Sequence, residues 1–276
     1  MVERRRDWKL LVVDVDGTLV GSGGVPTPRV REAIAAAQEK GIRIALCSGR
    51  PLASCWPIAR SLGLRGAHVV FNGALVKDPD EPVAVLCRPL PPGPARQVVS
   101  YCRAHELCLE LYTEETHYVE RDWRESQLHA ISIQVTYEFG DFDDVLKTAQ
   151  VVKFQIITAD DRARRLAAEL GRSLKDTLGF SVAIPMAPAD GMECVNVVDR
   201  GVSKGLAVRA LLEHYGLQPS QVLAAGDAPN DLPVFAEVGY RIAMGGGDSS
   251  ILAAADFVAP DVDEDGLAVA IERILL

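Results

Sequence analysis

The stretch Leu10-Leu11-Val12-Val13-Asp14-Val15-Asp16-Gly17-Thr18 decides the fold, because an apolar run is followed at once by two carboxylates and a glycine. Four consecutive apolar residues are expected for a strand buried on both faces, as in a parallel sheet. Two acids at positions i and i+2 of an extended chain point to the same side, and glycine permits a sharp turn after them. Ligands of open α/β sheets bind beyond the carboxyl ends of the strands, so this stretch predicts a site at one edge of a sheet.

Two carboxylates this close repel each other, so a cation between them or a shared proton is expected. Hard oxygen ligands favour magnesium or calcium. The acid pair also resembles the start of an EF-hand loop, but the sixth position of such a loop would be Leu19 rather than glycine, and the twelfth Val25 rather than glutamate. From this stretch alone, both interpretations stay possible: a catalytic site, or a solvated turn that binds ions nonspecifically.

The chain around this stretch alternates strands and helices. Thr27-Pro28 predicts the start of a helix that Gly41 ends, and a strand at 42–47, a helix at 51–62 and a strand at 67–71 follow. After Met192 the alternation resumes, with strands expected at 194–198, 221–225 and 240–243 and helices at 203–215 and 230–237. This order predicts an α/β fold with a doubly wound, Rossmann-like parallel sheet and right-handed crossovers.

Between residues 83 and 187 the order of the expected elements changes, after the turn-rich segment 78–82. Strands are expected at 83–86, 108–112, 130–135, 153–158 and 180–184, and helices at 95–105, 142–150 and 161–174. We therefore predict an inserted α+β cap domain at 83–187, within a catalytic core made of residues 1–82 and 188–276.

Two polar clusters lie beside other expected elements. Ser48-Gly49-Arg50 follows the second strand, where a hydroxyl and backbone N–H groups could hold a phosphate oxygen, although Ser-Gly is also common in plain turns. Ser203 is expected to cap a helix whose first turn carries Lys204. An ammonium at a helix N-terminus attracts anions, but a capped helix with an exposed lysine is the plain alternative.

A further cluster, Gly226-Asp227-Ala228-Pro229-Asn230-Asp231, follows the apolar strand at 221–225. It brings two acids and an amide to a strand end, or it is simply a helix start rich in capping residues. Each of the four clusters follows a strand or opens a helix, so all can meet on one rim of one sheet. Their conjunction favours one shared site over four independent turns.

The four clusters together resemble the motifs of the haloacid dehalogenase superfamily of aspartyl phosphatases, which match 14–18, 48–50, Lys204 and 226–231. The long interval from Arg50 to Lys204 resembles the Cof-type subfamily, class II with a subtype B cap. Further similarity lies in Asn72-Gly73 and at 243–245, 255–258 and 263–266. Pro229 departs from the pattern, but proline fits the first turn of a helix, so no harm to a metal site is expected.

The resemblance implies a Mg²⁺-dependent phosphatase that acts through an aspartyl-phosphate. Asp14 would be the nucleophile, Asp16 the general acid and base, and Lys204 the cation that offsets the charge of the phosphate. Asp14, the backbone carbonyl of Asp16 and Asp227 would bind the metal, and Asp231 would orient the waters of the metal. The residues expected to bind phosphate or substrate are Thr18, Ser48, Gly49, Arg50, Asn72 and Asn230. We expect Lys204 and Asp227 to lie within roughly 10 Å of Asp14.

Three other functions are known for related folds or sites. A dehalogenase shares the fold but typically lacks the second acid, so Asp16 argues against it. A phosphomutase, like the phosphomannomutases, would return the phosphoryl group to the sugar, and a non-catalytic phosphosugar-binding module would need a lost catalytic group. The expected substrate is a small phosphomonoester such as a sugar phosphate, with phosphoglycolate, pyridoxal phosphate and flavin mononucleotide as further candidates. His117 and Tyr118 are interpreted as surface residues, and Glu193 as a cap or ion-pair partner.

The composition fits a globular enzyme. Of 276 residues, 48% are hydrophobic and 24% charged, and the net charge of −9 argues against binding to a nucleic-acid backbone. The apolar run at 10–13 is too short for a membrane span or a signal-peptide core, so we predict a cytoplasmic protein without membrane association. The six cysteines lack Cys-x-x-Cys spacing and are interpreted as reduced, buried side chains. A monomer or a homodimer is expected.

Overall fold

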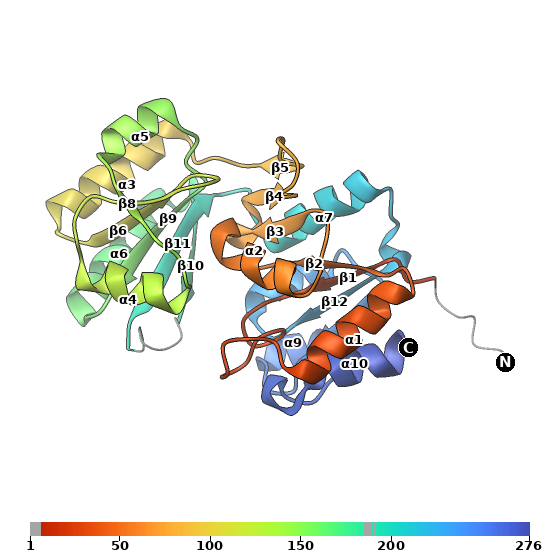
Figure 1. Cartoon of the computed structure of the whole chain (residues 1–276). Coiled ribbons are helices and arrows are strands. Elements are labelled where there is room, and N and C mark those ends of the chain that lie inside the picture. Colours follow the sequence, from red (N-terminus) through yellow and green to blue (C-terminus); the bar gives the residue numbers. More distant parts are fainter. Residues whose placement is uncertain (1–6, 185–188, 190) are drawn as a thin grey trace. The chain divides into compact units, whose positions relative to one another are not determined.

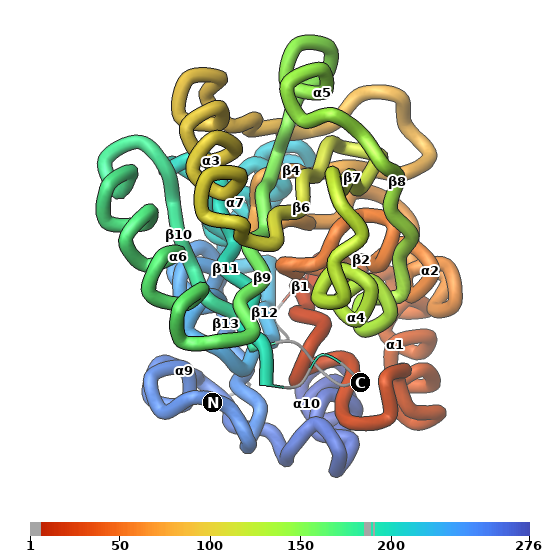
Figure 2. The backbone as a smooth tube through the Cα atoms, turned by 90° about the vertical axis from the view of Figure 1, so that its left-hand side faces the viewer, coloured from red at the N-terminus to blue at the C-terminus, as the bar shows by residue number. Residues whose placement is uncertain are grey.

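The computed structural model describes residues 7–184, 189 and 191–276, which fall into two compact units. The first unit holds the chain up to Gly49, then Cys55–Leu86 and Ser203–Leu276, and the second holds Arg50–Ser54 and Cys87–Val202 (Figure 1). In Figure 2 the second unit runs mainly from yellow through green to teal, between the two ends of the colour range. The second unit is therefore an insertion in the chain of the first.

The first unit is built on a five-stranded parallel sheet in the order β14-β13-β12-β1-β2. Its strands are β1 (Leu10–Val13), β2 (Arg43–Leu46), β12 (Val222–Gly226), β13 (Tyr240–Ala243) and β14 (Phe257–Val258). The four residues of β1 are fully buried, because β1 lies in the interior of the sheet between β2 and β12. The predicted α/β fold with a parallel core is confirmed.

Two helices of this unit begin at the capping side chains that the sequence predicts. The hydroxyl of Thr27 accepts from Val30 N at the start of α1, and that of Ser203 accepts from Leu206 N at the start of α7. The α-helices are α1 (Pro28–Glu39), α2 (Leu52–Ser61), α7 (Lys204–Tyr215), α8 (Leu232–Phe235), α9 (Ser249–Ala254) and α10 (Gly266–Ile274). Short 3₁₀ turns are η1 (Phe71–Gly73), η2 (Pro219–Gln221), η3 (Pro229–Asp231) and η4 (Val262–Glu264).

A smaller three-stranded sheet contains β3 (His68–Val70), β4 (Leu75–Lys77) and β5 (Leu86–Cys87). A parallel bridge between Cys47 and Val69 joins β3 to the end of β2, so the predicted third strand does follow the second in space. The strand expected at 83–86 is wrong in its bounds. Residues 83–85 lie outside the strand, directly after the turn at 78–82, which contains two prolines.

The second unit has a six-stranded sheet in the order β10-β11-β9-β6-β7-β8, antiparallel except for the β7–β8 pair. Its strands are β6 (Cys108–Tyr112), β7 (His117–Val119), β8 (Glu138–Phe139), β9 (Lys153–Thr158), β10 (Leu178–Ala183) and β11 (Glu193–Asp199). Its helices are α3 (Pro92–Ala104), α4 (Arg124–Ser132), α5 (Phe142–Thr148) and α6 (Asp161–Leu174). Apolar side chains of α3, α5 and α6 pack in one core with Leu109, Leu111, Phe154 and Ile156 of the sheet.

Two predictions about the insertion are wrong. The segment 130–135 was expected to be a strand, and Ile131, Ile133 and Val135 do alternate in it, but its first part is the end of α4. In α4 the buried residues Ser126, His129 and Ala130 recur at helical spacing, and this helical pattern overrides the apolar alternation.

The predicted return to the core at residue 188 is also wrong. The strand at 193–199 is β11, which pairs with β9 and β10 of the second unit, and the chain re-enters the first unit only at Ser203. A continuous apolar strand fits either sheet, so the sequence pattern did not reveal which one it joins. The predicted boundary between residues 187 and 188 itself lies outside the described residues.

All six cysteines are free, and five of them are buried. Within the described part of the chain, no helix combines the length and the apolar character needed to cross a bilayer.

Candidate active site

The end of β1 carries Asp14 to the edge of the parallel sheet. Its backbone N–H donates to Ala225 O at 3.0 Å, and its side chain is 9% exposed. The chain then turns tightly, with Gly17 N donating to Val20 O at 2.9 Å. Gly17 has a φ of +81°, and a Cβ there would lie 2.3 Å from Asp227 Oδ2. Only glycine lets the backbone after Asp14 approach Asp227 this closely.

Lys204 brings an ammonium to the same edge. Because Ser203 caps α7, Lys204 is the first helical residue, and its side chain is 1% exposed. Its Nζ lies 2.6 Å from Asp14 Oδ1 and 2.7 Å from Asp231 Oδ1. The alternative of an exposed surface lysine is therefore wrong, and the expected proximity of Lys204 to Asp14 is met.

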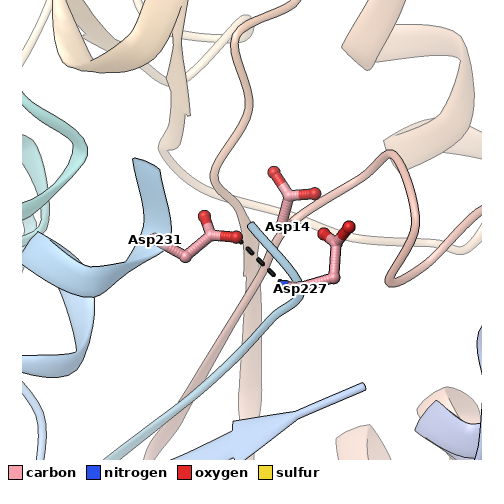
Figure 3. A group of neighbouring side chains, drawn as sticks. All are labelled: Asp14, Asp227 and Asp231. Carbon is pink, nitrogen blue, oxygen red and sulfur yellow. Dashed lines mark hydrogen bonds between the residues drawn. The ribbon is translucent and has the colours of Figure 1, made fainter. Parts of the chain in front are cut away.

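Asp227 and Asp231 follow β12 and complete a group of three carboxylates with Asp14 (Figure 3). One oxygen from each residue lies within 4.8 Å of the others. Asp231 Oδ2 accepts from Asp227 N at 3.2 Å and from the next backbone N–H at 3.3 Å. The hydroxyl of Thr18 donates to Asp227 Oδ1 at 3.2 Å, so Thr18 holds an acid of the group, a role that we did not predict.

The charges of this group are not balanced by the protein. Burial raises the pKa of Asp14 well above its usual range, against the lowering effect of Lys204, and the neighbouring acids add to the rise. Burial and then Asp231 raise the pKa of Asp227 to about 6. Burial by itself would lower the pKa of Lys204, but Asp14 and Asp231 outweigh it and raise that pKa well above the ordinary value. The raised pKa values of Asp14 and Asp227 show that the single ammonium of Lys204 does not offset the crowded negative charge of this group.

A divalent cation suits this arrangement. Three carboxylates against one ammonium leave an excess of negative charge at a partly buried place, and carboxylate oxygens are the ligands that magnesium prefers. Both oxygens of Asp231 already accept hydrogen bonds from Lys204 and the backbone. Asp14 and Asp227 are thus the residues best suited to contact a metal directly, with Asp231 holding Lys204 and the Asp227 backbone in place.

Ser48, Gly49 and Asn72 lie together after β2 and β3. Asn72 N donates to Ser48 O at 3.0 Å, and a Cβ on Gly49 would lie 2.9 Å from Asn72 Oδ1. Asn72 has a φ of +57° and Phe71 a φ of +53°. Two consecutive non-glycine residues in the left-handed region carry strain, which is typical of functional sites.

The remaining three predicted site residues, Asp16, Asn230 and Arg50, are also not part of the carboxylate group. Asp16 is half-buried and its backbone pairs with Val20 in an isolated bridge, while its charge contributes to the raised pKa values of Asp14 and Asp227. Asn230 is exposed in the turn η3. Arg50 clusters with the second unit, where its guanidinium donates to Ser54 Oγ at 3.2 Å. The catalytic role of Asp16 and the phosphate contacts of Asn230 and Arg50 stay predictions.

The second unit contains a buried polar network that the sequence did not reveal. His117, interpreted as a surface residue, is 6% exposed on β7 and stacks on Tyr112 with ring centroids 4.3 Å apart. Glu110 is fully buried and accepts from Tyr112 OH at 2.7 Å, and His129 Nδ1 lies 2.8 Å from the same carboxylate. Glu193 lies 3.2 Å from Arg164 Nε, as the ion-pair interpretation expects.

Comparison with known proteins places this geometry in a family. The model of the haloacid dehalogenase-like hydrolases matches residues 11–271. The protein named "Putative phosphatase YxeH" of Bacillus subtilis (strain 168) is 28% identical over 98% of this chain and 99% of its own. The crystal structure of TM0651 from Thermotoga maritima superposes with a TM-score of 0.86 at 25% identity, covering 97% of each chain.

A further solved structure has the same fold. BT4131, a subclass IIB sugar phosphatase of the same superfamily, gives a TM-score of 0.79 at 21% identity, over 96% of this chain and 98% of the other. The match over nearly the full length of both chains includes the inserted unit. The resemblance inferred from the sequence motifs is confirmed.

Proposed function

The chain belongs to the haloacid dehalogenase-like hydrolases and is a phosphoric monoester hydrolase, and we propose that it removes phosphate from a small metabolite through a phospho-aspartate on Asp14 with Mg²⁺ as cofactor. One observation carries the proposal. The ammonium of Lys204 lies 2.6 Å from the carboxylate of Asp14, within a group of three acids whose oxygens are close enough together to hold a metal ion.

In this proposal, Asp14 and Asp16 supply the steps of the reaction. An oxygen of Asp14 attacks phosphorus, the bond from phosphorus to the ester oxygen breaks, and Asp16 gives that oxygen a proton. Asp16 then takes a proton from water, whose oxygen attacks the phosphorus of the aspartyl-phosphate. The acyl–phosphate bond breaks, phosphate leaves and Asp14 is regenerated.

Attack by a carboxylate on a phosphate dianion is strongly repulsive, so the site has to offset negative charge. Lys204 is fixed for this purpose by its two buried carboxylate partners, and it costs no reorganisation when the substrate arrives. A bound Mg²⁺ would supply further neutralisation of the phosphate oxygens. Asp14 and Asp227 would hold it, and Thr18 keeps Asp227 in position.

The leaving group is proposed only as a class. The catalytic side chains act on the phosphoryl group and do not specify the rest of the substrate. A small phosphomonoester such as a sugar phosphate is the first candidate. The polar residues Ser48 and Asn72, close to each other after β2 and β3, are suited to bind phosphate or the adjoining hydroxyl groups.

The test is release of inorganic phosphate from a panel of phosphorylated metabolites with Mg²⁺ and with EDTA. We expect turnover with Mg²⁺ and loss of it with EDTA. Asp14→Asn should lower kcat by on the order of 10⁴-fold or more, because the nucleophile is lost. Full activity after exhaustive chelation, or near wild-type turnover of a folded Asp14→Asn protein, would refute the proposal. Isomerisation without phosphate release would identify a phosphomutase instead.

A further inference from the structure

The loop between the catalytic turn and α1 is held by a distant part of the chain. Residues 21–27 have no regular structure, but Ser22 N donates to Asp263 Oδ1 at 2.9 Å. At the other end of the loop, Thr27 Oγ1 donates to Asp265 Oδ1 at 2.5 Å. Both acceptors belong to the segment 261–265, which precedes α10. The loop after the two catalytic aspartates is thus fixed at both ends by one acidic segment.

Segment 261–265 approaches its neighbours closely at two glycines. A Cβ on Gly21 would lie 2.1 Å from Asp263 Oδ1, so a side chain at residue 21 would displace the carboxylate. A Cβ on Gly246 would similarly lie 2.0 Å from Asp261 Oδ2. Segment 261–265 therefore also contacts the loop that follows β13.

That second loop supports Asp227. The backbone N–H of Asp248 donates to Asp227 O at 2.8 Å, and a Cβ on Gly247 would lie 2.7 Å from the same oxygen. Segment 261–265 consequently lies against both loops whose positions determine where Asp16 and Asp227 stand. Its carboxylates serve as hydrogen-bond acceptors for neighbouring segments.

The path from Asp263 to Asp16 is short. Ser22 is two residues from Val20, and Val20 pairs with Asp16 through the backbone and accepts from Gly17 N at 2.9 Å. A shift of Ser22 is therefore expected to move Asp16, because a short, hydrogen-bonded segment connects the two residues. Asp16 is half-buried at this turn and has to meet the ester oxygen within hydrogen-bond reach.

We propose that Asp263 is a positioning residue: by accepting from Ser22 N it sets the loop at 20–22 and, through it, the place of the Asp16 carboxyl group. The inference rests on the proposed function, in which Asp16 protonates the leaving oxygen. A small misplacement of a general acid is costly, whereas the nucleophile Asp14 is held separately by β1 and Lys204. Loss of Asp263 should therefore weaken leaving-group protonation more than nucleophilic attack.

The test compares substrates whose leaving groups differ in their need for a proton. We would measure kcat/KM for 4-nitrophenyl phosphate, whose leaving group departs with little help, and for the best alkyl phosphate of the panel. Asp263→Ala should lower the alkyl value about tenfold more than the aryl value, a difference of about 1.4 kcal/mol in the barrier. Asp263→Asn keeps an oxygen acceptor for Ser22 N and should restore most of the loss.

Glu264 gives a matched control, since its side chain is exposed in the same segment and has no hydrogen bond or ion pair within the described residues. Glu264→Ala should leave both values unchanged. Equal losses on both substrates in Asp263→Ala, or an Asp263→Asn variant as damaged as Asp263→Ala, would overturn the inference. The variant Asp16→Asn distinguishes failure of the acid role of Asp16 from failure of the positioning role of Asp263. If it shows the selective alkyl loss and Asp263→Ala does not, the positioning role alone fails; if it shows none, the acid role of Asp16 fails and the inference with it.

Discussion

Replacing Lys204 with methionine tests the charge balance of the carboxylate group. Methionine keeps most of the length and volume of the side chain, which is 1% exposed, but removes the ammonium that lies 2.6 Å and 2.7 Å from two carboxylates. Three acids would then share a largely buried place with no compensating charge. Removing one partner of a buried ion pair costs about 3–5 kcal/mol, because the remaining charge stays desolvated.

The pH dependence of this loss has a defined sign. The carboxyl groups of Asp14 and Asp227 have raised pKa values, so the variant can relieve repulsion by taking up protons as the pH falls. In urea unfolding with EDTA, we expect Lys204→Met to be about 3–5 kcal/mol less stable than wild type at pH 8. The deficit should shrink at pH 5. Turnover should be lost at both values.

A lysine outside the site gives the control. Lys9 pairs with Asp7 at the surface of the same unit, with 45% of its side chain exposed. Lys9→Met should change the unfolding free energy by no more than about 0.5 kcal/mol, as surface substitutions usually do. A Lys204→Met deficit below about 1 kcal/mol, or one of equal size at pH 5 and pH 8, would show that the reasoning about the buried charges is wrong.

Two further predictions concern single acids. Because the pKa of Asp227 is raised to about 6, this group lowers stability as the pH rises from about 4 to about 6, by at most about 3 kcal/mol before solvent screening. In EDTA, Asp227→Asn should therefore flatten the stability profile over that range and lose the stabilisation by Mg²⁺; an unchanged profile contradicts this. In the second unit, burial would lower the pKa of His129, but Glu110 outweighs burial and raises that pKa to about 10. The stability that protonated His129 contributes is therefore fully present below about pH 6.5 and is lost as the pH rises through about 10. Glu110→Gln should cost about 3–5 kcal/mol at pH 6 and clearly less at pH 10.5, and an equal cost at both values would exclude an ionic role.

The core and its carboxylate group could be predicted because local signals and global fold agree there. Apolar runs such as 10–13 and 222–225 fix buried strands, and the capping residues Thr27 and Ser203 fix helix starts. The carboxyl ends of parallel strands lie at one edge, so residues separated by 190 positions, such as Asp14 and Lys204, meet without further information.

The insertion was harder to predict because its pairing partners are not local. The apolar strand β11 looks the same whether it joins the parallel sheet or the six-stranded sheet, and only its register with β9 decides between them. His117 stands in a polar stretch of sequence, yet the strand β7 turns it onto Tyr112 and toward Glu110, 3.3 Å from its Nε2. Burial of polar side chains in mutual contact leaves no apolar pattern to read.

The roles of Thr18 and Asp263 show a second kind of limit. Thr18 was predicted to bind phosphate, which stays a prediction, and the contact of its hydroxyl with Asp227 was not foreseen. Asp263 lies 241 positions from its hydrogen-bond donor, Ser22, in an acidic stretch that also fits a solvated turn. Contacts between two irregular segments follow no periodicity, so they become visible only with coordinates.

The most direct test of the account is to trap the phosphorylated enzyme. The protein would be mixed with a turned-over substrate and Mg²⁺, quenched in acid within the first turnover, and reduced with borohydride, which converts an acyl phosphate to homoserine. Peptide mass spectrometry should then find homoserine at residue 14 in the wild type and none after the same treatment without substrate. Active enzyme that yields no homoserine, or yields it at a residue other than Asp14, would contradict the account.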